Sequence, residues 1–260
     1  MPFTVCERKE RMELHDFFEK YDEVAVAFSG GVDSSYLLCM AKKYAKKVRA
    51  YYVKSEFQPE FELEDSMKLS QYLEVEMKVI YLQSLKDEKV AENPSNRCYY
   101  CKKIIFQRII EEAKTDGFTI ILDVTNASDD ASDRPGMKAL EEMKILSPLR
   151  LCDLTKEEIR ERSKAEGLFT WNKPAYACLA TRIPTGEVIT KEKLKAVEKA
   201  ETFLFSLGFS DFRVRVRKET AVLQLRLCDW QLLMKNRKKI WKELKKYYAA
   251  VVLDLEVRDE

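Results

Sequence analysis

Apolar residues in the first two thirds of the chain form short runs of strand length, separated by longer stretches with helical spacing. The short β-rich runs are 24–28, 48–53, 75–82, 118–123 and, more weakly, 144–147. Helical periodicity fills 34–46, 60–72 and 99–115. Strands that alternate with helices of this length predict an α/β fold, a parallel sheet with helices on both faces. Ligands of such sheets bind beyond the carboxyl ends of the strands.

The pattern changes towards the C-terminus. Thr155 and Glu158 have the spacing of a capping box and predict a helix that ends near Gly167. The polar, proline-containing segment 170–186 then reads as a connector. After it we expect a helix over 190–207, strands over 212–217, 221–227 and 250–257, and a basic helix over 229–247. We therefore predict a larger α/β domain over 1–170 and a smaller α+β domain over 171–260, to which we assign substrate binding and oligomerisation.

A glycine turn follows the first predicted strand directly and leads into a helix. It reads Ser29-Gly30-Gly31-Val32-Asp33-Ser34-Ser35. Two adjacent glycines let the main chain approach an anion and adopt positive φ. The hydroxyls of the three serines add donors, and the helix N-terminus adds partial positive charge. No Gly-Lys-Ser/Thr follows, so this is not a Walker A loop. The turn predicts a phosphate site; the simpler alternative is an ordinary turn before a helix.

Composition and charge narrow the class of protein. The chain has 260 residues, 46% of them hydrophobic, and its 46 Lys and Arg nearly balance 44 Asp and Glu. The formal net charge of +2 makes nucleic acid an unexpected partner. We expect no signal peptide, and the sequence has no apolar run of the ~20 residues that a membrane span needs. We expect a cytoplasmic protein. A single histidine, His15, nearly excludes histidine acid–base chemistry.

Cysteines form the second chemical feature. The seven cysteines of a protein expected in a reducing compartment suggest metal binding or catalysis more than disulfides. Cys98 and Cys101 make a C-x-x-C motif at an expected helix start. There the helix dipole and the cations Arg97, Lys102 and Lys103 would lower the pKa values of both thiols. The motif alone fits a redox pair, half of a zinc site or part of an iron–sulfur site.

Cys178, in the polar connector, is the best candidate for a third member of this group. A structural zinc site takes four ligands, and the sequence has no second C-x-x-C. Three thiolates would leave one iron of a cubane cluster without a protein ligand. That open iron could hold an added sulfide and deliver sulfur.

Several motifs together resemble one family. The loop pattern Ser-Gly-Gly-x-Asp-Ser is that of the PP-loop ATP pyrophosphatases, which split ATP between its α and β phosphates. With the C-x-x-C motif and the segments 123–130, 132–136, 177–182 and 212–217, the chain resembles, over most of its length, the LarE family of ATP-dependent sulfur transferases of nickel-pincer nucleotide biosynthesis. The resemblance implies that a carboxylate of pyridinium-3,5-biscarboxylic acid mononucleotide is adenylated and that sulfur then displaces AMP.

The resemblance also implies how the sulfur is supplied. Some members sacrifice the sulfur of one cysteine, matching Cys178, whereas others hold a 4Fe–4S cluster on three cysteines and relay external sulfide. With Cys98, Cys101 and Cys178, this chain resembles the cluster type. The implied cofactors are ATP, Mg²⁺ and the cluster. The implied partners are the carboxylate substrate and sulfide or a sulfur-donor protein, and we also expect a homo-oligomer.

The resemblance also implies roles for further residues. Asp33 would help to organise the magnesium–phosphate end of ATP, and Arg182 would lie near the reacting carboxylate or phosphate. The residues expected around the nucleotide are Ser29, Gly30, Gly31, Asp33, Ser34, Ser35, Asn126, Asp129 and Arg134. Arg213 and Arg215, which share one face of a strand, are candidates for the substrate phosphate. Turn formation is the alternative role for the 126–134 residues, and a solvated basic strand face is the alternative for the two arginines.

Other activities stay open at this stage. tRNA thiolation would need a wide basic surface, for which 235–246 is the candidate. A PP-loop ligase or amidotransferase that uses ammonia would need no cluster. A non-enzymatic ATP-binding regulator would use the cysteines for a structural metal.

Overall fold

Four parallel strands form the sheet of the N-terminal part. The computed structural model describes residues 11–129 and 135–258. The strand order is β3 (Met77–Tyr81), β2 (Lys47–Lys54), β1 (Glu23–Ala27) and β4 (Ile120–Leu122). Because β1 lies between β2 and β4, the loop that follows β1 opens at the carboxyl edge of the sheet, between the ends of two neighbouring strands.

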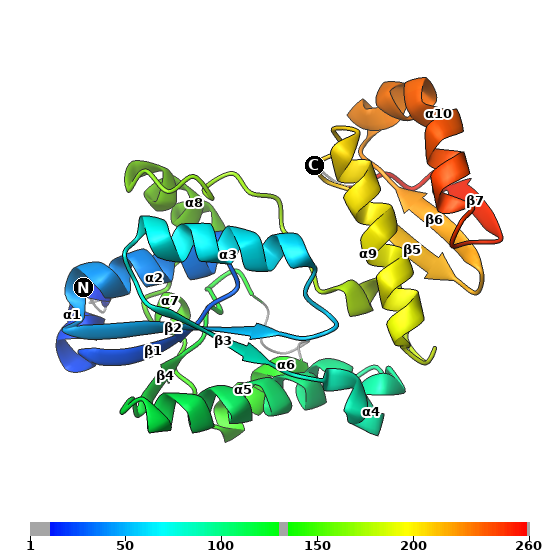
Figure 1. The fold of residues 1–260 in the computed structure, drawn as a ribbon. Helices are drawn as coiled ribbons and strands as arrows, with labels where there is room; N and C mark the ends of the chain where they lie inside the picture. Colours follow the sequence, from blue (N-terminus) through cyan, green and yellow to red (C-terminus); the bar gives the residue numbers. More distant parts are fainter. Residues whose placement is uncertain (1–10, 130–134, 259–260) are drawn as a thin grey trace, which may run out of the picture.

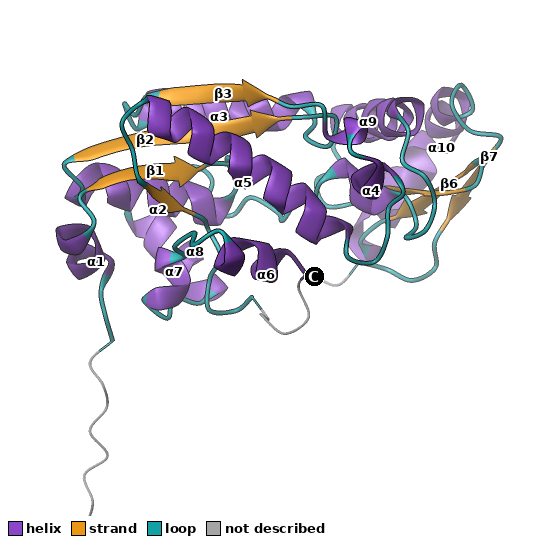
Figure 2. Cartoon of the chain, turned by 90° about the horizontal axis from the view of Figure 1, so that it is seen from below, coloured by secondary structure: helices purple, strands orange, loops and turns teal. Residues whose placement is uncertain are grey.

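Helices cover both faces of this sheet (Figures 1 and 2). The first face carries α1 (Leu14–Lys20), α2 (Val32–Tyr44), α3 (Glu60–Tyr72), α7 (Pro148–Leu151) and α8 (Lys156–Ala165). The second face carries α5 (Arg97–Thr115) and α6 (Pro135–Glu142). The short elements η1 (Ser84–Lys86) and α4 (Glu88–Ala91) lead from β3 to α5. Apolar side chains cover both faces, which explains why β1 reads as a continuous apolar run.

The C-terminal part has a sheet of its own. Its order is β5 (Arg213–Arg217), β6 (Thr220–Gln224) and β7 (Ala250–Leu253), with β5 antiparallel and β7 parallel to β6. The helices α9 (Lys191–Ser206) and α10 (Trp230–Leu244) contribute to one apolar cluster with this sheet. The Thr190 hydroxyl caps α9 by accepting from the Lys193 amide, and Gly208, with φ of 97°, follows its end.

A connector joins the two parts, which form two lobes in Figure 1. It contains η2 (Leu179–Arg182), and the Leu179 amide donates to the Phe57 carbonyl at 2.9 Å. The Gly186 amide donates to the Asn93 carbonyl at 2.8 Å. Phe57 also packs in the apolar cluster of the C-terminal part. These contacts hold the segment around Cys178 against the N-terminal part.

The predicted α/β class with a smaller C-terminal sheet is confirmed. α3 has the predicted bounds, and the capping box of Thr155 and Glu158 begins α8. The expected strand over 144–147 forms only one parallel bridge, between Leu122 and Leu146. It is short because Lys144 has φ of 55° and Pro148 already begins α7. Among the described helices, none is long and apolar enough to cross a membrane.

Candidate functional site

The loop over Ser29–Ser35 leaves the carboxyl end of β1 and runs into α2. Gly30 has φ of 68°, and a Cβ at this position would lie 2.4 Å from Ser66 Oγ and 3.3 Å from the Ser66 backbone. The position therefore requires glycine. Gly31 has an extended backbone instead, with φ of −80°, and is the N-cap of α2. The expected positive φ thus occurs at one of the two glycines, while the first turn of α2 provides amide groups without intrahelical partners.

The three serines of the loop differ in their surroundings. Ser34 and Ser35 are buried, and their hydroxyls donate to the Gly31 carbonyl at 3.1 and 2.6 Å. Ser29 is exposed, with its Oγ 3.2 Å from Ser34 Oγ. In this structure Ser34 and Ser35 shape the loop, whereas Ser29 faces the space where a ligand would bind.

A cavity of about 310 Å³ extends from the loop to the connector. Asp33 and Cys178 both line it, together with Ser29, Gly31, Val32, Gln58, Glu62, Lys156, Lys173, Pro174, Ala175 and Tyr176. Asp33 Oδ2 pairs with Lys156 Nζ at 2.6 Å, while Asp33 Oδ1 is buried without a hydrogen-bond partner among the described residues. Lys173 Nζ lies 3.3 Å from the Gly30 carbonyl. A carboxylate oxygen without a partner, next to two lysines, fits a magnesium–phosphate group.

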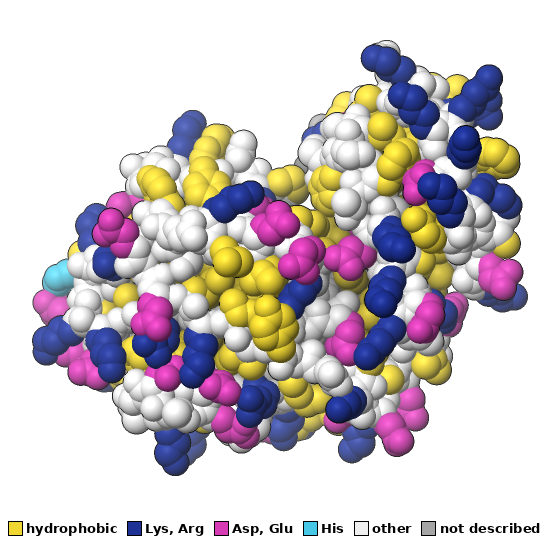
Figure 3. Space-filling view, viewed as in Figure 1, with side chains coloured by type: hydrophobic (Ala, Val, Ile, Leu, Met, Phe, Trp, Pro, Cys, Tyr) yellow, Lys and Arg dark blue, Asp and Glu magenta, His cyan; other side chains and the backbone are white. Residues whose placement is uncertain are grey.

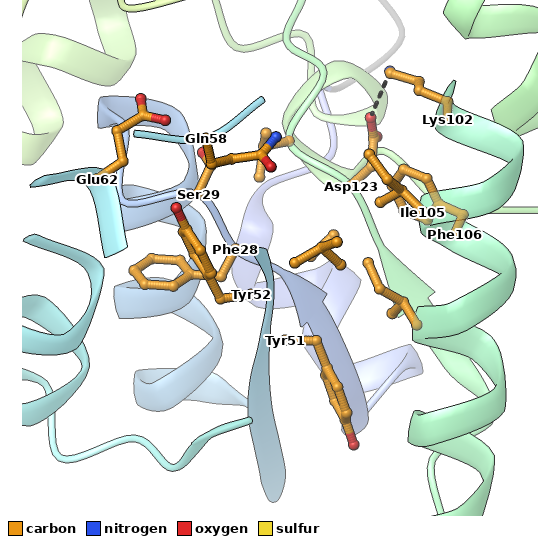
Figure 4. A pocket seen from close by; sticks show the side chains of 14 residues that line it. Phe28, Ser29, Tyr51, Tyr52, Gln58, Glu62, Lys102, Ile105, Phe106 and Asp123 are labelled. Carbon is orange, nitrogen blue, oxygen red and sulfur yellow. Dashed lines mark ion pairs between the residues drawn. The ribbon is translucent and has the colours of Figure 1, made fainter. Parts of the chain in front are cut away.

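A second cavity of about 200 Å³ adjoins the first and is shown in Figure 4. Its walls are mostly apolar and come from β1, β2 and α5, with Phe28, Val53 and Phe106 among them. The Tyr52 hydroxyl is buried in the structure and has no partner among the described residues. An apolar cavity beside a phosphate loop suits a planar base. At its rim, Lys102 Nζ lies 3.9 Å from Asp123 Oδ2.

The structure brings the three predicted cysteines into one region. Cys98 and Cys101 lie in the first turn of α5, and Cys178 is the residue before η2. Arg97 joins the two segments, because it donates to Cys98 Sγ at 3.8 Å and to the Ala180 carbonyl at 3.2 Å. The three sulfur atoms do not all lie within 4.8 Å of one another, so they are not arranged around a single ion.

The expected lowering of the thiol pKa is wrong for Cys101. Burial raises the pKa of Cys101 to about 12, and the neighbouring Cys178 and Cys98 add to this rise. Burial also raises the pKa of Cys178. Arg97 lowers both pKa values, but by less, and Lys103 pairs with Glu142 at 3.0 Å instead. Without a metal these two side chains are thiols, and a metal would have to displace their protons.

Arg182 is buried, and each of its nitrogens donates to a group of the chain. Its Nε and Nη2 donate to Glu201 at 2.8 and 3.0 Å, and its Nη1 donates to the Ala177 carbonyl at 2.8 Å. Its guanidinium lies 4.6 Å from the ring centre of Tyr176, whose hydroxyl also donates to Glu201. This geometry fixes the connector around Cys178.

Arg213 and Arg215 lie on one face of β5, opposite the buried Val214 and Val216. Arg213 donates to the Phe212 and Ala175 carbonyls, and Arg215 donates to Gln224 and, at 3.1 Å, to the Thr181 carbonyl. Burial, with the charges of Arg182 and Arg258, lowers the pKa of Arg213 to about 10. The region beside the connector therefore concentrates positive charge and favours an anion.

The turn after β4 supports the site without lining either cavity. The Asn126 amide donates to Asp129 Oδ2 at 3.1 Å, and Asn126 Oδ1 accepts from the Ser128 amide at 2.8 Å. Ser128 Oγ accepts from the Lys156 amide at 2.9 Å, which braces the residue that pairs with Asp33. Arg134 lies outside the described residues.

Sequence reasoning missed Glu62, Lys156, Lys173 and Glu201. Lys156 follows the predicted cap Thr155, and Lys173 lies in the predicted connector. Both lysines could therefore have been found from their positions next to predicted features. Glu62 is one of several acidic residues at the start of α3, and Glu201 lies inside α9. Nothing local distinguishes these two from solvated helix residues.

The fold and the site together define a class of protein. A parallel sheet whose central strand β1 ends in a Ser-Gly-Gly-x-Asp-Ser loop, next to paired cavities, is a PP-loop α/β protein. The family model of queuosine biosynthesis protein QueC matches residues 23–93, which include this loop.

Comparison with known proteins identifies the family. An uncharacterized protein of Synechocystis is 35% identical over 82% of this chain and 80% of its own length. Pyridinium-3,5-bisthiocarboxylic acid mononucleotide synthase of Lactiplantibacillus plantarum is 33% identical over 78% of this chain and 74% of its own. An uncharacterized protein of Methanocaldococcus jannaschii is 29% identical over 92% and 91%. The chain belongs to the LarE-type PP-loop sulfur transferases, enzymes that use ATP, usually with Mg²⁺. The resemblance found in the sequence is confirmed.

Proposed function

We propose that this chain adenylates a carboxylate of pyridinium-3,5-biscarboxylic acid mononucleotide and replaces AMP with sulfur, which yields a thiocarboxylate. The name of the Lactiplantibacillus relative supports this acceptor. The observation that carries the proposal is the single cavity lined by both Asp33 and Cys178. ATP activation and sulfur delivery can then act on one bound acceptor without its release.

The loop and the two cavities would bind different parts of ATP. Adenine enters the apolar cavity, and the pyrophosphate lies on the amides of the first turn of α2, close to Lys156 and Lys173. Asp33 helps to hold Mg²⁺ through the oxygen that has no protein partner. A substrate carboxylate oxygen attacks the α-phosphorus, the bond from that phosphorus to the bridging oxygen breaks, and pyrophosphate leaves.

The arginines next to the connector would bind and orient the acceptor. Arg213 and Arg215 supply positive charge for its phosphate, which would also stabilise their own charged forms in a desolvated position. Arg182 is a positioning residue, because it holds the segment around Cys178 through Glu201. We also propose that 1–170 and 171–260 are separate domains and that the protein is a cytoplasmic homo-oligomer, which light scattering coupled to gel filtration tests.

We further propose that Cys98, Cys101 and Cys178 hold a 4Fe–4S cluster. Their donor set fits this group, because three thiols from two segments converge beside Arg97 and are spaced too widely for one ion. Such a cluster, when bound, would present one iron without a protein ligand to an external sulfide. Iron and acid-labile sulfide in anaerobically purified protein test the assignment. Cluster loading that stays unchanged when all three cysteines are replaced by alanine would contradict it.

The enzymatic proposal is tested by product analysis. Wild-type protein with ATP, Mg²⁺, sulfide and the biscarboxylate nucleotide should form AMP and pyrophosphate in equal amounts, together with thiocarboxylate. Ammonia in place of sulfide should give no amide. Amide formation by a variant that lacks all three cysteines would instead indicate an ammonia-using ligase.

A second candidate, tRNA thiolation, is favoured by the charge of the C-terminal part. Residues 171–260 contain 19 Lys and Arg against 12 Asp and Glu, a net charge of +7. Dark blue side chains crowd this lobe in Figure 3. The exposed cations of α10 are Lys235, Arg237, Lys238, Lys239 and Lys242, beside the exposed Trp241. Salt-dependent tRNA binding, and loss of thiouridine on deletion of the gene, would support it.

A further inference from the structure

Glu62 lies where the two cavities meet. Both are lined by Ser29, Gln58 and Glu62, and Glu62 is the one ionisable carboxyl among these three. It is the third residue of α3, so its backbone is fixed by a helix that packs on the sheet. Figure 4 shows its side chain on the same side of the cavity as Gln58 and Ser29. If adenine fills the apolar cavity and pyrophosphate lies on the loop, the α-phosphate must lie at this junction.

The cations around Glu62 already have other partners. Lys173 pairs with Asp65 at 2.8 Å, Lys54 with Glu60 at 3.2 Å, and Arg182 with Glu201 at 2.8 Å. Within the described part of the chain, no hydrogen bond or ion pair reaches the Glu62 carboxyl. Glu62 is half-buried, and a desolvated carboxylate without a partner is costly, a cost that the group avoids by keeping its proton.

The charged neighbours of Glu62 have opposite effects on its pKa. Burial raises the pKa of Glu62 to about 7; Lys173, Arg182 and Lys54 lower it, and Asp65 raises it further. Tyr52 and Tyr176 also interact with Glu62, and burial raises the pKa of each, which keeps both neutral. A nucleotide and a dicarboxylate bound in these cavities would add negative charge, which favours the protonated form of Glu62 still more.

We propose that Glu62 acts as a neutral carboxylic acid that donates a hydrogen bond to an anionic oxygen at the α-phosphate. The proposal rests on the proposed function, because it uses the same placement of ATP. An ionised Glu62 would repel both the α-phosphate and the attacking carboxylate. The protonated form removes that repulsion and adds a donor at the reacting phosphorus, so it favours ATP binding and the approach of the acceptor.

Nucleotide binding without any sulfur acceptor tests this role. The probe is the α,β-methylene analogue of ATP with Mg²⁺, titrated by calorimetry between pH 6 and 8.5 into wild type, Glu62→Gln and Glu62→Ala. The Gln amide donates at every pH, whereas wild type loses its donor as pH rises through the pKa of Glu62. The ratio of the wild-type Kd to that of Glu62→Gln should therefore rise roughly fivefold or more over this range. Glu62→Ala should bind more weakly than Glu62→Gln at each pH.

The matched control is Glu64→Gln, because Glu64 is an exposed carboxylate on the same helix. Its Kd should track wild type across the range. If Glu62→Gln fails to fold, the wild-type protein alone still tests the proposal. Binding of the analogue to wild type at pH 7.5, compared in buffers of different ionisation enthalpy, should take up protons. A Kd ratio constant within about twofold, or no proton uptake by wild type, would overturn the proposal. Neither outcome depends on the identity of the sulfur acceptor, so the proposed function stands or falls separately.

Discussion

The phosphate loop and the connector are built by different means, although both line one cavity. The loop is held by its own main chain. Gly30 has a left-handed conformation, and the hydroxyls of Ser34 and Ser35 donate hydrogen bonds to the Gly31 carbonyl. The connector instead relies on a buried ion pair between Arg182 and Glu201. A backbone device is local in sequence, whereas a side-chain network joins distant residues, so the two regions should respond differently to mutation.

Removal of the buried ion pair in the connector should give the largest loss of stability. Arg182→Ala leaves Glu201 buried without its cation, which we expect to cost about 3–5 kcal/mol in the free energy of unfolding. Urea denaturation measures this. Arg108→Ala, which removes an exposed pair with Glu111, is the control and should cost less than about 1 kcal/mol. Equal losses in the two variants would show that the buried pair does not organise the connector.

Gly30→Ala should disrupt the backbone conformation of the phosphate loop. The left-handed conformation alone costs an L-residue about 1–2 kcal/mol, and the new Cβ would also meet Ser66 at 2.4 Å. We expect a total of about 2–3 kcal/mol, together with loss of pyrophosphate release. Gly186→Ala is the matched control, since Gly186 has φ of 85° and open space around its Cβ position. It should show only the conformational cost and keep full ATP binding. Wild-type pyrophosphate release by Gly30→Ala would contradict the loop geometry.

Asp33→Asn tests whether the loop also needs a charged side chain. The amide keeps the shape but loses the charge that pairs with Lys156 at 2.6 Å and faces the proposed Mg²⁺. We expect pyrophosphate release to fall about tenfold, which corresponds to ~1.4 kcal/mol. The fall should shrink at high Mg²⁺ concentration if weakened metal binding is its cause, and a fall independent of Mg²⁺ would exclude that role.

The smallest effect should come from two helix caps that lie outside both the loop and the connector. Thr155→Ala at α8 and Thr190→Ala at α9 each remove a hydroxyl that accepts from a backbone amide. Each should cost about 1 kcal/mol in the free energy of unfolding, with little change in activity. A much larger loss for Thr155→Ala would mean that this cap also supports the pairing of Lys156 with Asp33.

Local patterns predicted most of the fold. The bounds of α3, the cap at Thr155 and the end of α9 near Gly208 follow from periodicity and short motifs, and the structure has all three. The loop over 29–35 was found in the same way, because its strand, turn and helix are contiguous. The expected strand over 144–147 was too long because a positive φ at Lys144 and the start of α7 depend on context.

The site was predictable only where its chemistry is local. The sequence pointed to the three cysteines, but it suggested a lowered pKa for Cys101, because the burial of that side chain is not visible in a motif. The pairing of Arg182 with Glu201 is not visible in the sequence, because Glu201 lies 19 residues away inside a helix. Glu62 was missed for the same reason: its junction position depends on two cavities that only the folded chain forms.

In the proposed function, ATP activation and sulfur delivery are separate acts performed in one cavity, and Cys178→Ala distinguishes the two. Single-turnover assays with ATP, Mg²⁺, the biscarboxylate nucleotide and sulfide would follow pyrophosphate and thiocarboxylate together. We expect pyrophosphate release within about threefold of wild type and thiocarboxylate below about one hundredth of it. Thiocarboxylate formation by Cys178→Ala at the wild-type rate would show that Cys178 does not deliver the sulfur.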